Sequence, residues 1–351
     1  MANQTRQLAQ LLSEDGCDVT LVQTNVPYRP AAIERLPGVR AIFRLLPYLR
    51  RLWVAIGGSE LVHVMANSGW AWHLFAAPAV WIARMRGVPA VVNYRGGDAD
   101  RFLTREMGLV RPTLLRAAAI AVPSGFLQTV FAKHGVATTI VPNIVRLDAF
   151  RPAASLEAHT NLLVARNLEA IYDIATAIRA FAIVAARCPD ASFTVAGSGP
   201  ERATLEALAE SLGVAAKVRF TGQLDNAELP KLYRSSAIVL NPSQVDNLPI
   251  SLLEALACGV AIVSTNVGGV PYMVEHETNA LLVPPGSPEA MAAAVLRLID
   301  DRLLAERLRL AGMTAARRYS WSAVRSELYA LYARVLGDAS AHRDANAAPV
   351  R

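Results

Sequence analysis

Short apolar runs rich in valine, isoleucine and leucine alternate along the whole chain with longer stretches in which apolar residues recur at helical spacing. Continuous apolar runs are typical of strands that are buried on both faces, and helices that cover such a sheet have one apolar face. The pattern therefore predicts an α/β chain built of repeated strand and helix units. The first half predicts strands at 18–24, 60–65, 89–94, 119–123 and 139–142. The second half predicts strands at 161–166, 192–197, 217–222, 237–241, 260–265 and 280–283, and helices near 171–187, 200–212, 226–235, 249–258 and 287–299.

The alternation is interrupted between Asn143 and His159, where prolines and small residues replace the periodic apolar positions. A chain of 351 residues is long enough to form two hydrophobic cores. We therefore expect two Rossmann-like domains with doubly wound parallel sheets, at 1–150 and 151–318, with a linker between them.

The two ends of the chain depart from this pattern. A helical pattern begins within the first few residues and ends at Gly16, whereas such a domain normally opens with a buried strand, so we expect the first strand and its loop to be missing. Residues 319–337 predict a helix that needs another surface to cover it, and we expect it to pack back on the N-terminal domain. Residues 338–351 are polar and small, and we expect them to be disordered.

Composition narrows the class of protein. Cys17, Cys188 and Cys258 are odd in number and far apart, which favours neither a disulfide framework nor a zinc cluster. No leader pattern is present, and no uncharged apolar run reaches the roughly 18 residues that a membrane span requires. We expect a cytoplasmic protein, although its mean hydropathy of +0.29 is high for a freely soluble enzyme.

The net charge is +6 and comes mostly from arginine. Six arginines with a single acidic residue lie in the segment 29–53, among leucines, Phe43 and Trp53. Such a mixture is typical of a segment that lies on an anionic membrane surface, and this would attach the protein to the inner face of the membrane. An ordinary connecting helix, kept short by Pro37 and Pro47, explains the segment equally well. Nucleic acid is not expected as a partner, because no motif of a nucleic-acid reader accompanies the charge.

The densest polar cluster of the second half follows the predicted strand 237–241. Pro249 is suited to a first helical turn, so the backbone N–H groups near it remain free and can bind a phosphate. Glu254 lies one turn further along this helix, where its carboxylate can accept hydrogen bonds from a ribose diol. Asp246 precedes the helix and would face the other end of the ligand. We predict that the backbone contacts come from Asn247, Leu248, Pro249, Ile250 and Ser251.

Other loops follow strands that end at the same edge of the predicted sheet. Gly197 and Gly199 follow the strand at 192–197, and a Gly268-Gly269 pair follows the strand at 260–265. Glycine lets a backbone approach a ligand closely, although glycine after a strand is usually turn chemistry. Arg166 ends the first strand of the domain, where its guanidinium could pair with a diphosphate. The set predicts a nucleotide site at the carboxyl ends of the strands.

In this order the motifs resemble those of the retaining glycosyltransferases of family 4, which have two Rossmann-like domains that face a cleft, the GT-B fold. The resemblance is strong over 160–300 and fainter over 17–150. It rests on a strand end with an arginine, a Gly-x-Gly-Pro turn, a strand that ends in Gly222, a Pro-Ser turn, two acids separated by seven residues, a Gly-Gly loop and a Leu-Leu-Val-Pro-Pro strand. The matching residues are Arg166, Gly197 to Pro200, Val218 to Gly222, Pro242-Ser243, Asp246 with Glu254, Gly268-Gly269 and Leu281 to Pro285.

The resemblance implies a metal-independent enzyme without a cofactor, which transfers a sugar from a nucleotide-diphosphate sugar with retention of the anomeric configuration. Glu254 would hold the ribose, Asp246 the hydroxyls of the sugar, and Arg166 the departing diphosphate. The acceptor would be a glycan or a lipid-linked molecule, in the synthesis of envelope or exopolysaccharide. Neither the base nor the sugar of the donor can be read from the sequence.

Several positions depart from the family pattern. The first acid is Asp246 where glutamate is usual, Tyr172 lies near the place of a lysine that shares the diphosphate, and Arg95 lies near the place of a histidine. These departures keep open a non-catalytic relative that binds a nucleotide or a partner. An epimerase of the same fold is a weaker alternative, because no further acid and base are evident. The pair Asp98 and Asp100 could hold a divalent ion, but arginines flank it and a loop is the simpler interpretation.

Overall fold

The computed structural model describes residues 2–24, 39–153, 160–225 and 227–347, and it divides into two compact units. Unit 1 comprises Met1–Pro142 with Arg325–Arg351, and unit 2 comprises Asn143–Val324. The first boundary lies eight residues before the predicted one at 150, because Asn143 and Val145 already bond to unit 2. The Asn143 side-chain amide donates to the carbonyl of Leu248 at 2.9 Å, and the Val145 N–H donates to the carbonyl of Tyr319 at 2.9 Å.

Unit 2 contains a six-stranded parallel sheet in the order β10-β9-β8-β5-β6-β7. From β5 the chain builds outward to β6 and β7, then returns to place β8 on the other side of β5. The strand order therefore reverses between β5 and β8, which is where doubly wound sheets bind their ligands. The strands are β5 (Asn161–Ala165), β6 (Ser192–Ala196), β7 (Val218–Gly222), β8 (Ile238–Asn241), β9 (Ala261–Thr265) and β10 (Leu281–Val283).

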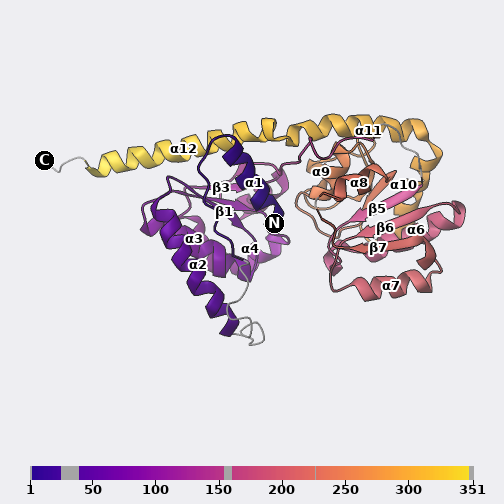
Figure 1. Cartoon of the computed structure of the whole chain (residues 1–351), viewed down its shortest axis with the longest axis horizontal. Coiled ribbons are helices and arrows are strands. Elements are labelled where there is room, and N and C mark those ends of the chain that lie inside the picture. Colours follow the sequence, from indigo (N-terminus) through magenta and orange to yellow (C-terminus); the bar gives the residue numbers. More distant parts are fainter. Residues whose placement is uncertain (1, 25–38, 154–159, 226, 348–351) are drawn as a thin grey trace. The chain divides into compact units, whose positions relative to one another are not determined.

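Helices cover both faces of this sheet, which explains why its strands read as continuous apolar runs (Figure 1). Successive strand residues point to opposite faces: Leu162 and Val164 belong to one core, and Leu163 to the other. The helices are α6 (Ile174–Arg187), α7 (Arg202–Ser211), α8 (Leu229–Arg234), α9 (Ile250–Ala257), α10 (Pro288–Asp300) and α11 (Arg302–Ala316). Each strand and helix predicted for this half is present, and α11 was not predicted.

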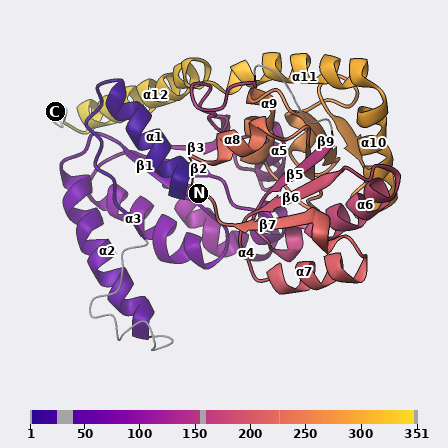
Figure 2. The same ribbon diagram turned by 45° about the vertical axis from the view of Figure 1, so that its right-hand side comes forward.

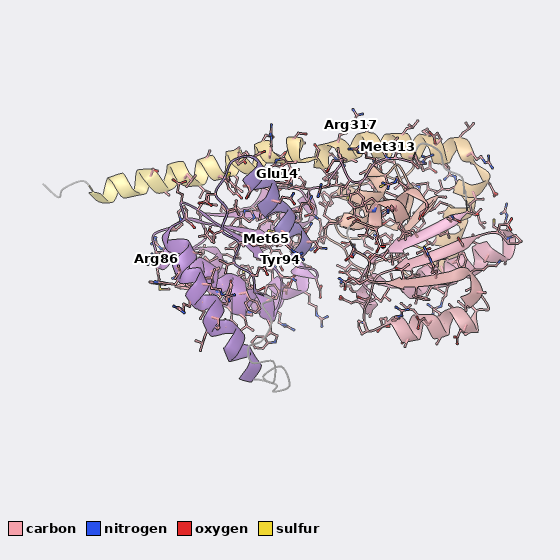
Figure 3. The ribbon with its side chains drawn as sticks, viewed as in Figure 1. Glu14, Met65, Arg86, Tyr94, Met313 and Arg317 are labelled. Atoms are coloured by element: carbon pink, nitrogen blue, oxygen red, sulfur yellow. The ribbon has the colours of Figure 1, made fainter. Side chains whose placement is uncertain are left out.

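Unit 1 contains a four-stranded parallel sheet in the order β1-β2-β3-β4. Figure 2 labels the first three of these strands. Its strands are β1 (Val62–Ala66), β2 (Ala90–Tyr94), β3 (Ala119–Val122) and β4 (Thr139–Ile140). Met65 and Tyr94 lie near the carboxyl ends of β1 and β2 (Figure 3). The other elements are α1 (Ala2–Glu14), α2 (Val39–Gly57), the π-helix η2 (Trp72–Ala76), α3 (Ala77–Met85), α4 (Ala99–Leu114) and α5 (Gly125–Lys133).

Helix α12 (Trp321–Ala347) closes the chain, and from Arg325 onward it belongs to unit 1. The Tyr332 hydroxyl lies 2.7 Å from Nδ1 of His63 in β1, and Arg334 donates to the Thr139 hydroxyl at 3.0 Å. We expected disorder from residue 338, but α12 continues to Ala347, because four of residues 338–347 are alanine, the best helix former, even where periodicity is weak. Residues 348–351 lie outside the described residues.

A chain of hydrogen bonds runs through unit 1 from the end of β2 to α12. Arg95 can only donate, so its Nε bonds to Oδ1 of Asn93 at 3.0 Å, and the Asn93 amide then faces Nε2 of His63 at 3.1 Å. His63 consequently carries its proton on Nδ1 and donates it to Tyr332. Burial, with the charge of Arg95 as a second cause, lowers the pKa of His63 to about 3. The imidazole is therefore neutral at physiological pH.

Two expectations for the first half were wrong. Residues 18–24 form no strand: they pair with neither edge of the sheet, Leu21 is 38% exposed, and Val22 is only partly buried against the core. Helix α2 runs for 19 residues with Pro47 inside it, because buried Tyr48, Leu52 and Ile56 hold one face on the core. Residues 25–38 of the arginine-rich segment lie outside the described residues. No described helix combines the length and the apolar character needed to cross a bilayer.

Candidate functional site

Arg166 and Asp246 meet at the point where the strand order of unit 2 reverses. Arg166 follows β5, Asp246 lies on the loop after β8, and Nη2 of the arginine lies 2.6 Å from Oδ2 of the aspartate. Their side chains are only 12% and 10% exposed. The structure thus brings together two residues that are 80 positions apart and were predicted to serve one ligand. It also pairs them with each other, which the sequence did not indicate.

Burial decides the electrostatics of Asp246. It raises the pKa of the carboxyl group above its usual value, and the charge of Arg166 opposes this rise without cancelling it. The Asn247 N–H and the Ser243 hydroxyl, which lies 3.5 Å from Oδ2, also favour the ionised form. A buried charge of this kind is stable only while its partner stays in place.

The guanidinium of Arg166 stacks on Tyr172. Its central carbon lies 4.0 Å from the centroid of the ring, a distance typical of a cation–π contact. Nε of Arg166 is buried and meets no hydrogen-bond partner among the described residues. In the sequence Tyr172 stands out only as a departure from the lysine of the family pattern. Its role could have been predicted, because a guanidinium stacks on an aromatic ring.

Helix α9 presents its N-terminus on the same side of the sheet, after the loop that carries Asp246. Pro249 precedes the first helical residue, and no side chain caps the free N–H groups. The Ser251 hydroxyl in this first turn is buried, and no described residue offers it a hydrogen bond. A buried polar atom without a partner is costly, so this hydroxyl and Nε of Arg166 indicate that the site takes a polar ligand.

Glu254 lies further along α9, and its carboxyl group forms a hydrogen bond with a buried side chain of the protein. Its Oε2 accepts a hydrogen bond from the hydroxyl of fully buried Tyr233 at 2.8 Å. Burial raises the pKa of Glu254 to about 7, while the Tyr233 hydrogen bond and the charge of Arg166 act in the opposite direction. Glu254 is thus part of the same electrostatic cluster as Arg166. Tyr233 was missed, although a buried tyrosine hydroxyl usually finds a polar partner.

The predicted glycines shape the site by contacts within the protein. A Cβ on Gly197, where φ is +146°, would lie 1.9 Å from the carbonyl oxygen of Arg166. A Cβ on Gly268, where φ is +52°, would lie 2.1 Å from the carbonyl oxygen of Asp246. These loops approach the loops that carry Arg166 and Asp246, and so fix the backbone at both residues. That they also approach a ligand stays a prediction. Gly199 lies similarly close to Leu168, and the Gly222 carbonyl accepts the Gly197 N–H at 2.9 Å.

The acidic pair of unit 1 is engaged with cations. Asp98 lies 3.9 Å from Arg101, and Asp100 lies 3.4 Å from Lys133. Within the described ranges, no group of three histidine, cysteine or acidic side chains could hold a metal ion.

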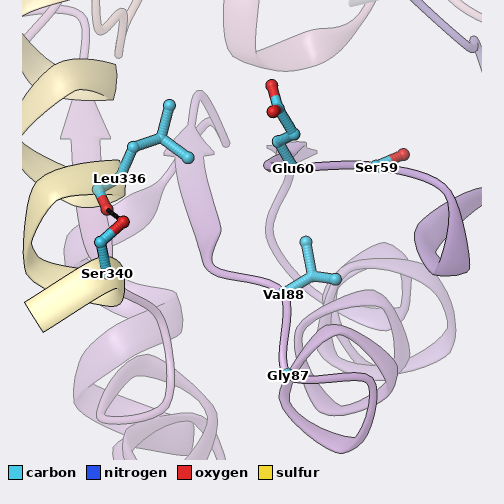
Figure 4. A pocket seen from close by; sticks show the side chains of 6 residues that line it. All are labelled: Ser59, Glu60, Gly87, Val88, Leu336 and Ser340. Carbon is cyan, nitrogen blue, oxygen red and sulfur yellow. Dashed lines mark hydrogen bonds between the residues drawn. The ribbon is translucent and has the colours of Figure 1, made fainter. Parts of the chain in front are cut away.

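A pocket in unit 1 lies away from these residues. It is bounded by the segments before β1 and β2 and by α12, and a hydrogen bond from Ser340 to the Leu336 carbonyl forms part of its wall (Figure 4). The lining residues are Ser59, Glu60, Gly87, Val88, Leu336 and Ser340. It lies at the amino ends of the strands, opposite the edge where doubly wound sheets bind ligands, so we assign it no role in the site.

Comparison with known proteins assigns each half of the chain to a family. Residues 149–314 match the family described as "Glycosyl transferases group 1", and residues 1–149 match the one described as "Glycosyltransferase Family 4". A phosphatidyl-myo-inositol mannosyltransferase of Mycobacterium tuberculosis is 31% identical over 299 residues, which cover 81% of this chain and 76% of that protein. An uncharacterized glycosyltransferase of Methanocaldococcus jannaschii is 35% identical over 144 residues, or 41% of this chain and only 37% of that protein.

Solved structures agree with the predicted architecture. Sucrose-phosphate synthase from Thermosynechococcus elongatus superposes with a TM-score of 0.75 at 19% identity, covering 95% of this chain and 93% of that one. The Anabaena protein HepE, in complex with UDP and glucose, gives a TM-score of 0.72 at 18% identity, covering 92% and 88%. At these identities the likeness concerns the fold, and it confirms the prediction of two Rossmann-like α/β domains.

Proposed function

Because the chain belongs to the family 4 glycosyltransferases and has the GT-B fold, we propose that it is a retaining enzyme that transfers a sugar from a nucleotide-diphosphate donor without a metal ion. The acceptor is a glycan or a lipid-linked molecule, and the product serves envelope or exopolysaccharide synthesis. UDP is the first donor nucleotide to test, since HepE was solved with UDP and glucose.

One observation carries this proposal: two buried donors, Nε of Arg166 and the hydroxyl of Ser251, have no partner among the described residues. The uncapped N-terminus of α9 adds free N–H groups and the positive end of a helix dipole. A diphosphate satisfies all of these donors at once, and a neutral ligand would not use the charge.

In the proposed reaction the bond between the anomeric carbon and the diphosphate breaks, and the negative charge that develops on the leaving phosphate is stabilised by Arg166 and by α9. The departing phosphate oxygen takes the proton of the acceptor hydroxyl as the new bond forms on the same face. Stabilisation of developing charge by fixed donors is usually the largest catalytic contribution, and one such donor contributes about 3 kcal/mol.

The two carboxyl groups have different roles in this scheme. Glu254, whose pKa lies near 7, accepts hydrogen bonds from the ribose diol, and Tyr233 holds it in place. Asp246 accepts hydrogen bonds from hydroxyls of the transferred sugar. Its ion pair with Arg166 fixes the distance between the part of the site that holds the sugar and the part that holds the diphosphate. The shorter side chain of aspartate is suited to this pair, because the carboxylate stays beside the guanidinium.

The exposed side chains of α2 favour attachment of unit 1 to an anionic membrane surface, where a lipid-linked acceptor would be found. Leu46, Trp53 and Val54 are 62%, 45% and 70% exposed, and Arg50 and Arg51 lie exposed among them. Exposed apolar groups interleaved with cations favour the interface of an anionic bilayer. Co-sedimentation with vesicles of phosphatidylglycerol, but not of phosphatidylcholine, tests this, and Trp53→Ala with Val54→Ser should abolish it.

Calorimetric titration of the protein with UDP, GDP and ADP tests the donor site. We expect one nucleotide to bind, and Arg166→Ala and Glu254→Ala each to weaken it by at least tenfold. Arg187→Ala is the matched control, because Arg187 pairs with Asp300 on the surface of the same unit. No binding by the folded wild type would refute the proposal. Tight binding without turnover of any donor would instead favour the non-catalytic alternative.

A further inference from the structure

We propose that Trp70, His73 and Glu106 form a carbohydrate-binding site in unit 1, which holds a sugar ring of the acceptor. The assignment to the acceptor rests on the proposed function, whereas the binding site itself rests on the geometry of unit 1. Trp70 follows the carboxyl end of β1, on the edge of the sheet where parallel α/β folds bind ligands. It is 77% exposed, against 45% for Trp53 and 39% for Trp81.

The exposed indole is held by an ordered loop. The Ser68 hydroxyl donates to the carbonyl of Gly97 at 2.6 Å and lies 2.8 Å from the Tyr94 hydroxyl, so the loop after β1 is tied to the loop after β2. The two loops are in close contact, since a Cβ on Gly96 would lie 2.5 Å from the Ser68 nitrogen. On the other side Trp72 is completely buried. The loop that carries Trp70 is therefore fixed, and the exposed ring lies edge to face with His73.

A polar pair stands beside this ring. Nε2 of His73 lies 2.6 Å from Oε2 of Glu106, and the rings of Trp70 and His73 lie 6.4 Å apart, edge to face. The hydrogen bond from His73, with further ones from Arg105, lowers the pKa of Glu106, so the group is a carboxylate and can only accept. His73 must then donate from Nε2. In the neutral ring Nδ1 is left as an acceptor, and the described residues give it no partner.

The backbone at His73 is also unusual. Trp72–Ala76 form a π-helix, a rare element that is frequently found at functional sites. The segment places Trp72 in the core and the adjacent His73 at the surface, with 26% of its side chain exposed, beside Glu106 of α4. The site is thus built from three parts: an apolar plane, an oriented acceptor and a carboxylate that fixes the acceptor.

This combination fits a sugar better than a protein or a lipid. A sugar ring has one face of C–H groups, which can cover an indole, and hydroxyls at its rim, one of which can donate to Nδ1 of His73. Protein and membrane surfaces need several contiguous apolar groups. Next to Trp70 the chain is polar or small: the residues before it are Asn67, Ser68 and Gly69, and the pair beside it is polar.

Saturation-transfer NMR on the full chain, with methyl α-mannoside, methyl β-glucoside and methyl β-galactoside as probes and UDP present, tests the site. We expect transfer to the ring protons of at least one glycoside. Trp70→Ala should abolish the transfer, His73→Ala should weaken it by about tenfold, and Trp70→Phe, which keeps a ring, should retain most of it. Trp81→Ala is the control for a partly exposed tryptophan outside the site and should leave the signal unchanged, and UDP affinity should be the same in all variants.

Equal transfer to the wild type and Trp70→Ala would overturn the proposal, and so would no transfer to any of the three glycosides. If glycosides bind through Trp70 but no nucleotide binds, the carbohydrate site stands and the transferase function fails. If UDP binds but no glycoside does, the nucleotide site of the proposed transferase stands and the carbohydrate site fails. A signal lost in both Trp70→Ala and Trp81→Ala would indicate an effect of tryptophan removal on the fold, and would also count against the site.

Discussion

The guanidinium of Arg166 lies 4.0 Å over the ring of Tyr172, near the place where the family pattern has a lysine. A second cation there would repel Arg166 when no ligand is bound, whereas an aromatic ring attracts it and limits its motion. The ion pair with Asp246 fixes the guanidinium from another direction. Arg166 is therefore held in one orientation before the donor arrives, which reduces the ordering that binding requires.

Replacing Tyr172 tests this support. We expect Tyr172→Leu to weaken UDP binding by about 2- to 30-fold, because a partly desolvated cation–π contact contributes about 0.5–2 kcal/mol. Tyr172→Phe keeps the ring and should bind nearly as well as the wild type. Calorimetry with UDP and with uridine separates an effect on the diphosphate from an effect on the nucleoside. We expect the substitution to weaken UDP binding and to leave uridine binding unchanged. A loss of uridine binding in Tyr172→Leu would show that the ring acts on the nucleoside.

Sequence patterns predicted most of unit 2 because its strands are buried on both faces and its helices alternate with them regularly. They also predicted that Arg166, Asp246 and Glu254 share one edge, since parallel strands end together. The partners of these residues could not be predicted in the same way. Tyr172 and Tyr233 come from separate segments, and only the packing of the sheet brings them beside Arg166 and Glu254.

Unit 1 was harder to predict from sequence. The run at 18–24 has the composition of a strand, but a strand must also pair with a sheet, and the composition of a segment does not show whether it does so. Pro47 predicted a short helix, yet apolar residues at helical spacing on both sides of it outweighed one lost hydrogen bond. The network of His63, Asn93 and Tyr332 joins β1, β2 and α12, and such polar contacts across distant elements leave no local signal.

Nucleotide binding should depend on pH through Glu254, whose pKa lies near 7. The carboxylate accepts two hydrogen bonds from a ribose diol, and protonation removes part of that capacity. Affinity should therefore fall as pH drops from 8 to 6, by about tenfold, because the ionised fraction falls by that factor. Glu254→Gln is the matched control, since it keeps the shape and does not titrate. UDP has its own titration near pH 6, so the measured quantity is the wild-type change relative to that of the variant. Parallel profiles for the two proteins would contradict the role of Glu254.

The glycine loops should affect nucleotide binding through the residues whose backbone they hold in place. Gly268→Ala forces a Cβ to 2.1 Å from the Asp246 carbonyl oxygen at a positive φ, so we expect a displaced Asp246 and a loss of nucleotide binding of at least tenfold. Gly213→Ala is the control, because it also has a positive φ, +71°, but open space around its Cβ. It should cost about 1–2 kcal/mol of stability and leave binding intact. Equal effects of both changes on binding would show that backbone strain alone is responsible.

His63 should make the stability of unit 1 sensitive to acid. Its pKa in the folded protein, about 3, lies below the ordinary value of 6.5, so the folded state binds fewer protons than the unfolded state between these values. The free energy of unfolding that this difference contributes is fully present above pH 6.5 and is lost as pH falls toward 3. Between pH 7.5 and pH 5 the loss amounts to about 2 kcal/mol.

The comparison of wild type with His63→Gln isolates this contribution from that of the carboxyl groups. Urea unfolding at both pH values should show a drop that is about 2 kcal/mol larger in the wild type. Tyr332→Phe removes the hydrogen bond to Nδ1 but leaves His63 buried beside Arg95, so it should lower stability at both pH values and keep the pH dependence. If the wild type and His63→Gln lose the same free energy on acidification, His63 is not held neutral by the fold. The chain of hydrogen bonds from Arg95 to Tyr332 would then have to be reoriented.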